Sequence, residues 1–135
     1  MELSNQLIRV ARAEIDRLAT VAWPVGALVI ASDDLLTETE YREIVLARDR
    51  GCRMFICLGR SAESNHDRLD DYLLEQPLDD VAMTTFHRDD QPLEDVASML
   101  VVYMRDQRDS AIVIVNITHE LTEGLIAQIE AVAAG

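Results

Sequence analysis

The sequence predicts an α/β fold, a three-layer α/β/α sandwich in which helices cover both faces of a four-stranded, mostly parallel sheet. Short continuous apolar runs recur along the chain, and such runs are typical of strands buried on both faces. Segments with helical apolar spacing alternate with these runs, which favours a flavodoxin-like or Rossmann-like sheet with right-handed crossovers. The 135 residues contain no Gly/Ser/Pro-rich linker, so we expect a single domain over residues 1–135.

The chain is expected to begin with a helix over residues 4–20, which Trp23-Pro24 would end. Residues 27–31 form a continuous apolar run, Ala-Leu-Val-Ile-Ala, that predicts the first strand. The apolar residues at helical spacing in the first segment are Leu7, Ala11, Ile15 and Leu18.

The second helix is expected to begin at Thr37, because Thr37 and Glu40 have the spacing of a capping box. Gly51 is suited to the position just after the end of that helix. The run Met-Phe-Ile-Cys-Leu at 54–58 predicts the second strand, and a polar loop is expected over 61–66.

Residues 67–76 are expected to form the third helix, and 81–86 a weaker third strand. A fourth helix is expected from Asp90 or Gln91, with Pro92 in its first turn. The strongest strand pattern lies at 111–115 and extends to Ile117, and a last helix is expected from about His119.

The predicted order of these four strands is the flavodoxin-like order 2-1-3-4. Thr84 and Thr85 argue partly against this order, because two polar residues fit a more exposed third strand.

The chain is strongly acidic, with a formal net charge of -13 from 25 acidic and 12 basic residues, all of the latter arginine. This charge repels nucleic acid, and the absence of lysine excludes Schiff-base, P-loop and pyridoxal-phosphate chemistry. An acidic surface favours a basic protein partner, or it serves solubility alone. A halophilic or high-GC source would produce the same composition without any functional meaning.

The two cysteines, Cys52 and Cys57, have a spacing that does not suit a disulfide or a shared metal, which fits a reducing compartment. The N-terminus lacks the basic and apolar regions of a signal peptide, and no apolar run has the roughly 20 residues that span a bilayer. We therefore expect a cytoplasmic protein without membrane contact. Cys57 is an unfavourable nucleophile, because a mid-strand thiol would be buried.

The candidate functional site lies at the carboxyl edge of the sheet, where open parallel sheets bind ligands at the point at which strand order reverses. Under the predicted order this point lies between the strands 27–31 and 81–86, with Thr118, His119 and Glu120 nearby. The candidate ligand or metal residues that would meet there are Asp33, Asp34, His87, Asp89 and Asp90.

Each of these residues also has a structural interpretation. The pairs Asp33-Asp34 and Asp89-Asp90 precede predicted helices, where carboxylates are favoured by capping and by the helix dipole. Carboxylates with a histidine would also suit a divalent cation, and His87 would suit a general base. No dinucleotide fingerprint, nucleophile elbow, zinc-protease motif or paired C-x-x-C is present, so no cofactor is expected.

The acidic pair Asp33-Asp34 resembles the metal-binding pair of response-regulator receiver domains. That resemblance implies a phospho-acceptor at Asp89 or Asp90 and a switch hydroxyl at Thr118. The chain departs from the pattern because it has no lysine, four predicted strands in place of five, and an additional first helix.

A second resemblance covers most of the chain and is carried by several short motifs. The chain is similar to a family of small uncharacterised bacterial proteins in which an aromatic-His pair follows Met-Thr-Thr. The resemblance implies that the His87 segment is a feature of the family, and it implies no activity. The motifs are Ser32-Asp33-Asp34, Gly51-Cys52-Arg53, Gly59-Arg60, Met83-Thr84-Thr85-Phe86-His87-x-Asp89 and Leu93-Glu94.

Small size, acidity and missing catalytic motifs favour a non-catalytic protein-binding module of the immunity, inhibitor or adaptor type. Its expected contact surface is acidic and comprises Asp70, Asp71, Asp79 and Asp80. The alternative is a small metal- or ligand-dependent enzyme that uses the cluster at the sheet edge. A homo-oligomer formed through the first helix or the strand at 111–117 is a third hypothesis, and it is compatible with either of the others.

Overall fold

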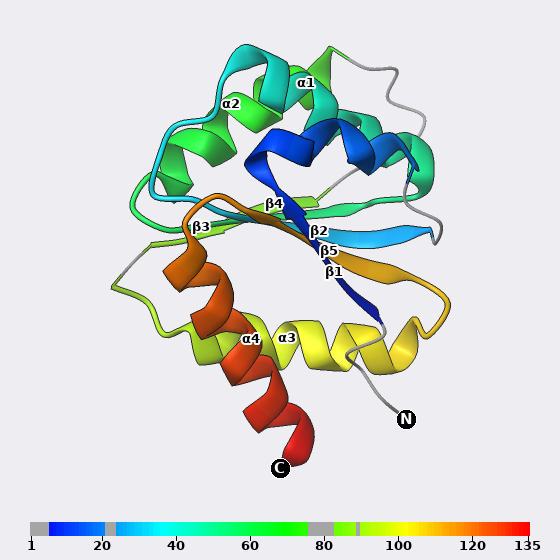
Figure 1. The fold of residues 1–135 in the computed structure, drawn as a ribbon, viewed down its shortest axis with the longest axis vertical. Coiled ribbons are helices and arrows are strands. Elements are labelled where there is room, and N and C mark those ends of the chain that lie inside the picture. The colour runs from blue at the N-terminus through cyan, green and yellow to red at the C-terminus, as the bar shows by residue number, and fades with distance from the viewer. Residues whose placement is uncertain (1–5, 21–23, 76–82, 89) are drawn as a thin grey trace.

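The computed structural model describes residues 6–20, 24–75, 83–88 and 90–135, and it confirms an α/β fold with a parallel sheet (Figure 1). The sheet has five strands in the order β1-β5-β2-β3-β4, and every neighbouring pair is parallel. The strands are β1 (Leu7–Ala11), β2 (Val25–Ala31), β3 (Met54–Leu58), β4 (Met83–His87) and β5 (Ala111–Asn116). The helices are η2 (Arg12–Thr20), α1 (Glu38–Val45), η3 (Leu46–Arg50), α2 (Ala62–Leu74), α3 (Leu93–Asp106) and α4 (His119–Ala134).

The predicted first helix over residues 4–20 is wrong, as is the strand count of four. Leu7–Ala11 form an edge strand, β1, which pairs with β5 from Leu7↔Ile112 to Ala11↔Asn116. Ile8 and Val10 contact the core on one face of the sheet, while Leu7 contacts the core on the other. This alternation is the period of a strand, and the 3-10 helix η2 begins after it, at Arg12.

Two hydrophobic cores lie on opposite faces of the sheet. Helices η2, α1 and α2 cover one face, and α3 and α4 cover the other (Figure 1). The central strands β2 and β5 supply residues to both cores, which is why their sequences lack polar residues except for Asn116 at the end of β5.

The predicted strand order is also wrong. The structure places β3 between β2 and β4, and β5 on the other side of β2. The strands β4, β3, β2 and β5 therefore follow the Rossmann order 3-2-1-4 in place of the flavodoxin order 2-1-3-4. β4 is an edge strand, which explains its half-exposed polar residues Thr84 and Thr85.

The helix signals of the sequence are partly confirmed. Thr37 and Glu40 form the predicted capping box of α1, and Gly51 ends η3 with a left-handed φ of 92°. The predicted loop over 61–66 is wrong, because α2 begins at Ala62, directly after a turn in which Gly59 has a φ of 101°. No helix in the described part of the chain is long and apolar enough to cross a membrane.

Candidate functional site

The observed strand order moves the expected ligand crevice. Chain direction across the sheet reverses between β2 and β5, whose following helices, α1 and α4, lie on opposite faces. The carboxyl ends of these two strands therefore bound the crevice where a sheet of this type holds its ligand. Asp33 follows β2 and Thr118 follows β5, so the two loops meet at this point.

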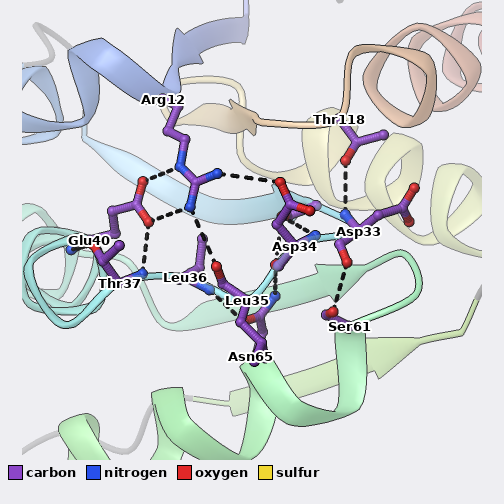
Figure 2. A network of polar contacts seen from close by, with 11 residues as sticks. Arg12, Asp33, Asp34, Leu35, Leu36, Thr37, Glu40, Ser61, Asn65 and Thr118 are labelled. Atoms are coloured by element: carbon purple, nitrogen blue, oxygen red, sulfur yellow. Dashed lines mark hydrogen bonds and ion pairs between the residues drawn. The ribbon is translucent and has the colours of Figure 1, made fainter.

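The chain's own hydrogen bonds close the crevice, and Asp33 is at their centre (Figure 2). The Asp33 N–H donates to Thr118 Oγ1 at 2.8 Å, and the Thr118 N–H donates to the Ala31 carbonyl at 2.8 Å. Ser61 Oγ donates to the Asp33 carbonyl at 2.7 Å, and the Arg60 N–H donates to Asp33 Oδ1 at 2.8 Å. The carboxylate thus lies near the N-terminus of α2, a position at which related folds bind anions.

Asn65, on α2, holds the loop between β2 and α1 by hydrogen bonds from its side chain (Figure 2). Its side chain is buried, and Oδ1 accepts from the Leu36 N–H at 3.1 Å and from the Tyr41 hydroxyl at 2.7 Å. Nδ2 donates to the Asp34 carbonyl at 3.0 Å. One amide therefore satisfies three polar groups of this loop and of α1.

Arg12 joins the first segment of the chain to this loop (Figure 2). Its Nε lies 2.6 Å from Glu40 Oε2, and a second guanidinium nitrogen lies 2.9 Å from Oε1, so the ion pair is bidentate. Burial raises the pKa of Glu40, but the hydrogen bonds from Arg12 and from the Thr37 N–H outweigh burial and lower it. Arg12 also lies 3.4 Å from an Asp34 carboxylate oxygen.

The structure does not bring the predicted cluster together on adjacent strands. β3 separates Asp33 and Asp34 from His87, which places them two strand spacings apart, about 10 Å. His87 Nδ1 is buried and has no partner within the described residues, and Asp90 is exposed. Asp89 lies outside the described residues. Whether any of these residues binds a ligand or metal stays a prediction.

The receiver-like arrangement is not formed. In that arrangement the acidic pair and the phospho-acceptor follow neighbouring strands, whereas here β3 intervenes between β2 and β4. Thr118 does lie beside Asp33, but its hydroxyl oxygen accepts the Asp33 N–H within the closed loop.

The expected partner surface divides between two sides of α2. Asp71 lines a groove of about 570 Å³ between α1 and α2, whereas Asp70 points toward β4 and accepts the Thr84 hydroxyl. Asp79 and Asp80 lie outside the described residues. The groove is lined by Glu38, Arg42, Arg68, Asp71, Tyr72 and Glu75.

A polar cluster between α2 and β4 was missed by the sequence reasoning. His66 Nε2 lies 3.1 Å from Thr84 Oγ1 and 3.6 Å from Asp70 Oδ2, and its Nδ1 lies 3.0 Å from Asp67 Oδ1. Thr84 is a poor nucleophile here, because its hydroxyl donates to Asp70 at 2.5 Å and not to the histidine. The sequence signal for this cluster is the four-residue spacing of His66 and Asp70, which indicates a shared helix face only when α2 begins at Ala62, before the predicted loop 61–66 ends.

The two cysteine thiols are a further kind of reactive group among the described residues. Cys52 and Cys57 are free and buried, and burial raises the pKa of each thiol to about 12. No group of three or more His, Cys, Asp or Glu side chains is placed to hold a metal ion within the described ranges. The geometry therefore shows a well-bonded loop system at the sheet edge.

The fold and the closed crevice define the class of protein, an open parallel α/β protein with a Rossmann-type strand order. Residues 8–134 match the model of a family described as "Domain of unknown function (DUF7684)", and the chain belongs to this family. The expectation of an uncharacterised family is thereby confirmed. Comparisons with curated proteins and with solved structures found no match.

Proposed function

We propose that this protein is a small, acidic, non-catalytic domain that binds a partner protein with a basic surface, as immunity, inhibitor or adaptor proteins do. The observation that carries the proposal is the closure of the crevice between β2 and β5. The backbone N–H, the carbonyl and one carboxylate oxygen of Asp33 are all used by neighbouring loops. These polar groups, at the position where such sheets receive a substrate, are thus engaged within the chain itself.

The charge of the α1/α2 face supports a basic partner. α2 carries four carboxylates and one arginine within Ala62–Leu74, and Glu75 follows directly, while the groove itself is lined by three carboxylates and two arginines. A strongly acidic surface accelerates encounter with a basic partner and discriminates against acidic ones. The net charge of -13 adds a long-range contribution in the same direction.

The groove between α1 and α2 offers a shape as well as a charge. Tyr72 forms part of its lining, and the Arg42 guanidinium lies 5.2 Å from the centroid of the Tyr72 ring. Tyr41 stacks on the same ring with 5.3 Å between centroids, so the chain itself covers the ring faces. Tyrosine is enriched in protein interfaces, and the carboxylates of the groove lining, Asp71 and Glu75, support an arginine-bearing partner segment.

The alternative function, a metal- or ligand-dependent enzyme at the carboxyl edge, has less support. Asp33 is committed to the closed loops, and His87 lies two strands away from it. Two free, buried thiols suit a reducing compartment, which supports a cytoplasmic location. Self-association is compatible with this function, and light scattering would detect it as a dimer mass.

The test compares two double variants with equal charge changes. Asp71→Asn with Glu75→Gln removes two of the three carboxylates that line the groove, whereas Glu120→Gln with Glu130→Gln neutralises exposed residues of α4 on the opposite face. Partners are captured from an extract of the native host, and the dissociation constant of each purified partner is then measured at low and high salt.

The proposal expects binding that weakens with salt and with the groove variant, and that survives in the α4 variant. Each exposed ion pair contributes about 0.2–1 kcal/mol, so losing two should weaken binding by roughly 2- to 30-fold. The proposal fails if no protein is captured above background, or if both double variants weaken binding equally.

A further inference from the structure

The groove between α1 and α2 already contains a guanidinium, that of Arg42. Its Nη2 lies 2.9 Å and its Nε 3.3 Å from Glu38 Oε1, one turn earlier on α1. Its Nη1 lies 3.9 Å from Glu75 Oε2 at the end of α2, so the side chain bridges the two helices. Its Cζ also lies 5.2 Å from the centroid of the Tyr72 ring. Two carboxylates and an aromatic ring therefore contact one guanidinium, and a partner's arginine would meet the same groups.

The two groups that cover the Tyr72 ring are held in different ways. Tyr41 stacks on the ring, is only 1% exposed, and donates its hydroxyl to the buried Asn65. The Arg42 side chain is 57% exposed, and that of its partner Glu38 is 67% exposed. Tyr41 therefore cannot leave the ring without opening the core, whereas the Arg42 guanidinium can turn into solvent.

The contacts of Arg42 are weak enough to be exchanged for those of another arginine. Exposed ion pairs, including a pair four residues apart on one helix, contribute little because water and salt screen both charges. A cation–π contact at an exposed site adds a similarly small amount. Arg42 therefore competes with any external guanidinium, and it lowers the apparent affinity of the groove in proportion to the time it occupies the ring.

We propose that Arg42 is an internal, displaceable occupant of the groove, and that an arginine side chain of the partner takes its place against the Tyr72 ring. This inference rests on the proposed function, because it names the group of the basic partner that the groove receives. A lysine is a poorer substitute, since only a planar guanidinium both stacks on a ring and hydrogen-bonds in a fork to carboxylates. Arg42 thus makes the groove selective, because a segment must restore its contacts in order to displace it.

The experiment is calorimetric titration of the full chain with a synthetic tetra-arginine peptide at physiological salt, with tetralysine for comparison. Arg42→Gln removes the internal guanidinium. Arg68→Gln is the matched control, because Arg68 also lines the groove and its loss makes the same charge change. Both positions are exposed, so neither variant should alter the fold, and circular dichroism checks this.

We expect Arg42→Gln to bind tetra-arginine roughly 3- to 30-fold more tightly than Arg68→Gln does. Both variants lose one positive charge, but only the first frees the Tyr72 ring. Tetralysine should gain less from the same substitution. When tetra-arginine is added to the wild type, the NMR signals of the Arg42 side chain, which the ring current of Tyr72 shifts, should move toward those of an exposed arginine.

Three results would overturn the inference. The first is equal affinity of Arg42→Gln and Arg68→Gln for tetra-arginine, or an equal gain for tetralysine, because charge alone would then explain binding. The second is a peptide that binds the wild type while the Arg42 signals stay unchanged. The third is absence of binding to Arg42→Gln at about 1 mM tetra-arginine. None of these results depends on capture of a host protein, so failure of this inference is distinguishable from failure of the proposed function.

Discussion

Replacing Asn65 by alanine is the most direct test of the loop that closes the sheet edge. The asparagine is fully buried and serves the Leu36 N–H, the Tyr41 hydroxyl and the Asp34 carbonyl. Leu36 and Tyr41 are themselves buried, so water cannot replace the lost partner for either group. Each unpaired buried group costs about 1–3 kcal/mol, so Asn65→Ala should lower the free energy of unfolding by about 2–6 kcal/mol.

This loss is large on the scale of the protein's stability, because domains of this size are stable by about 5–15 kcal/mol. Urea unfolding followed by circular dichroism measures it, provided that the slope of free energy against urea is unchanged. Ser64→Ala is the matched control: it is the preceding residue of α2 and is exposed, so its effect should stay within about 0.5 kcal/mol.

A double-mutant cycle separates the hydrogen bonds from the cavity that alanine leaves. Tyr41→Phe removes the hydroxyl that Asn65→Ala would otherwise strand, so the double variant should lose less stability than the sum of the single variants. A loss below about 1 kcal/mol for Asn65→Ala, or strict additivity in the cycle, would refute the reasoning.

Three further predictions concern single features of the fold. The pKa of Glu40 is lowered, because hydrogen bonds from its arginine and backbone partners outweigh the raising effect of burial. The stability that the Glu40 carboxylate contributes is therefore present above the ordinary pKa of 4.5 and is lost as the pH falls through the folded pKa. Glu40→Gln should therefore reduce stability at pH 7 and flatten its decline toward pH 3 in a series of urea titrations. Gly59→Ala should lower the free energy of unfolding by about 2–5 kcal/mol in the same assay, because an added Cβ would lie 2.5 Å from a backbone carbonyl oxygen at a positive φ. Gly51→Ala also has a positive φ, but its nearest contact is at 4.0 Å, so it should cost only about 1–2 kcal/mol. Burial raises the pKa of the Cys52 and Cys57 thiols to about 12, so a thiol reagent at pH 8 should label neither in the native chain and both in denaturant, and rapid native labelling would contradict their burial.

The central strands were predictable from sequence because both of their faces are buried. β2 and β5 contribute to the cores above and below the sheet, so their runs are apolar up to Asn116 at the end of β5 and cannot be mistaken for a surface helix. The capping box at Thr37 was equally predictable, since it depends on two residues three positions apart.

The first strand could not be distinguished from a helix by spacing alone. Residues 7–11 form an edge strand whose apolar side chains divide between two cores, and Leu7 and Ala11 also fit one side of a helix. Pairing with β5, more than 100 residues later in the chain, decides the outcome. Such a contact leaves no local sequence signal.

The error in the predicted strand order also changes which residues of the predicted site can meet. Thr84 and Thr85 did indicate an exposed strand, and the structure explains them by placing β4 at the sheet edge. Once β3 lies between β2 and β4, the predicted meeting of Asp33 with His87 cannot occur on adjacent strands. Asp33 is expected to lie at a helix N-terminus because it precedes a predicted helix. Its carboxylate does accept an N–H near a helix N-terminus, but the helix is α2 and not the one that follows Asp33 in sequence.

The groove lies on one side of α2 only, which separates its contribution from that of the helix as a whole. Asp71 lines the groove with α1, while Asp70 faces β4. Asp71→Asn should therefore weaken binding of the partner, whereas Asp70→Asn, which makes the same charge change at the preceding position, should leave it unchanged. If both variants weakened binding equally, the partner would be attracted by the acidity of α2 as a whole, and the groove would have to be abandoned as the contact surface.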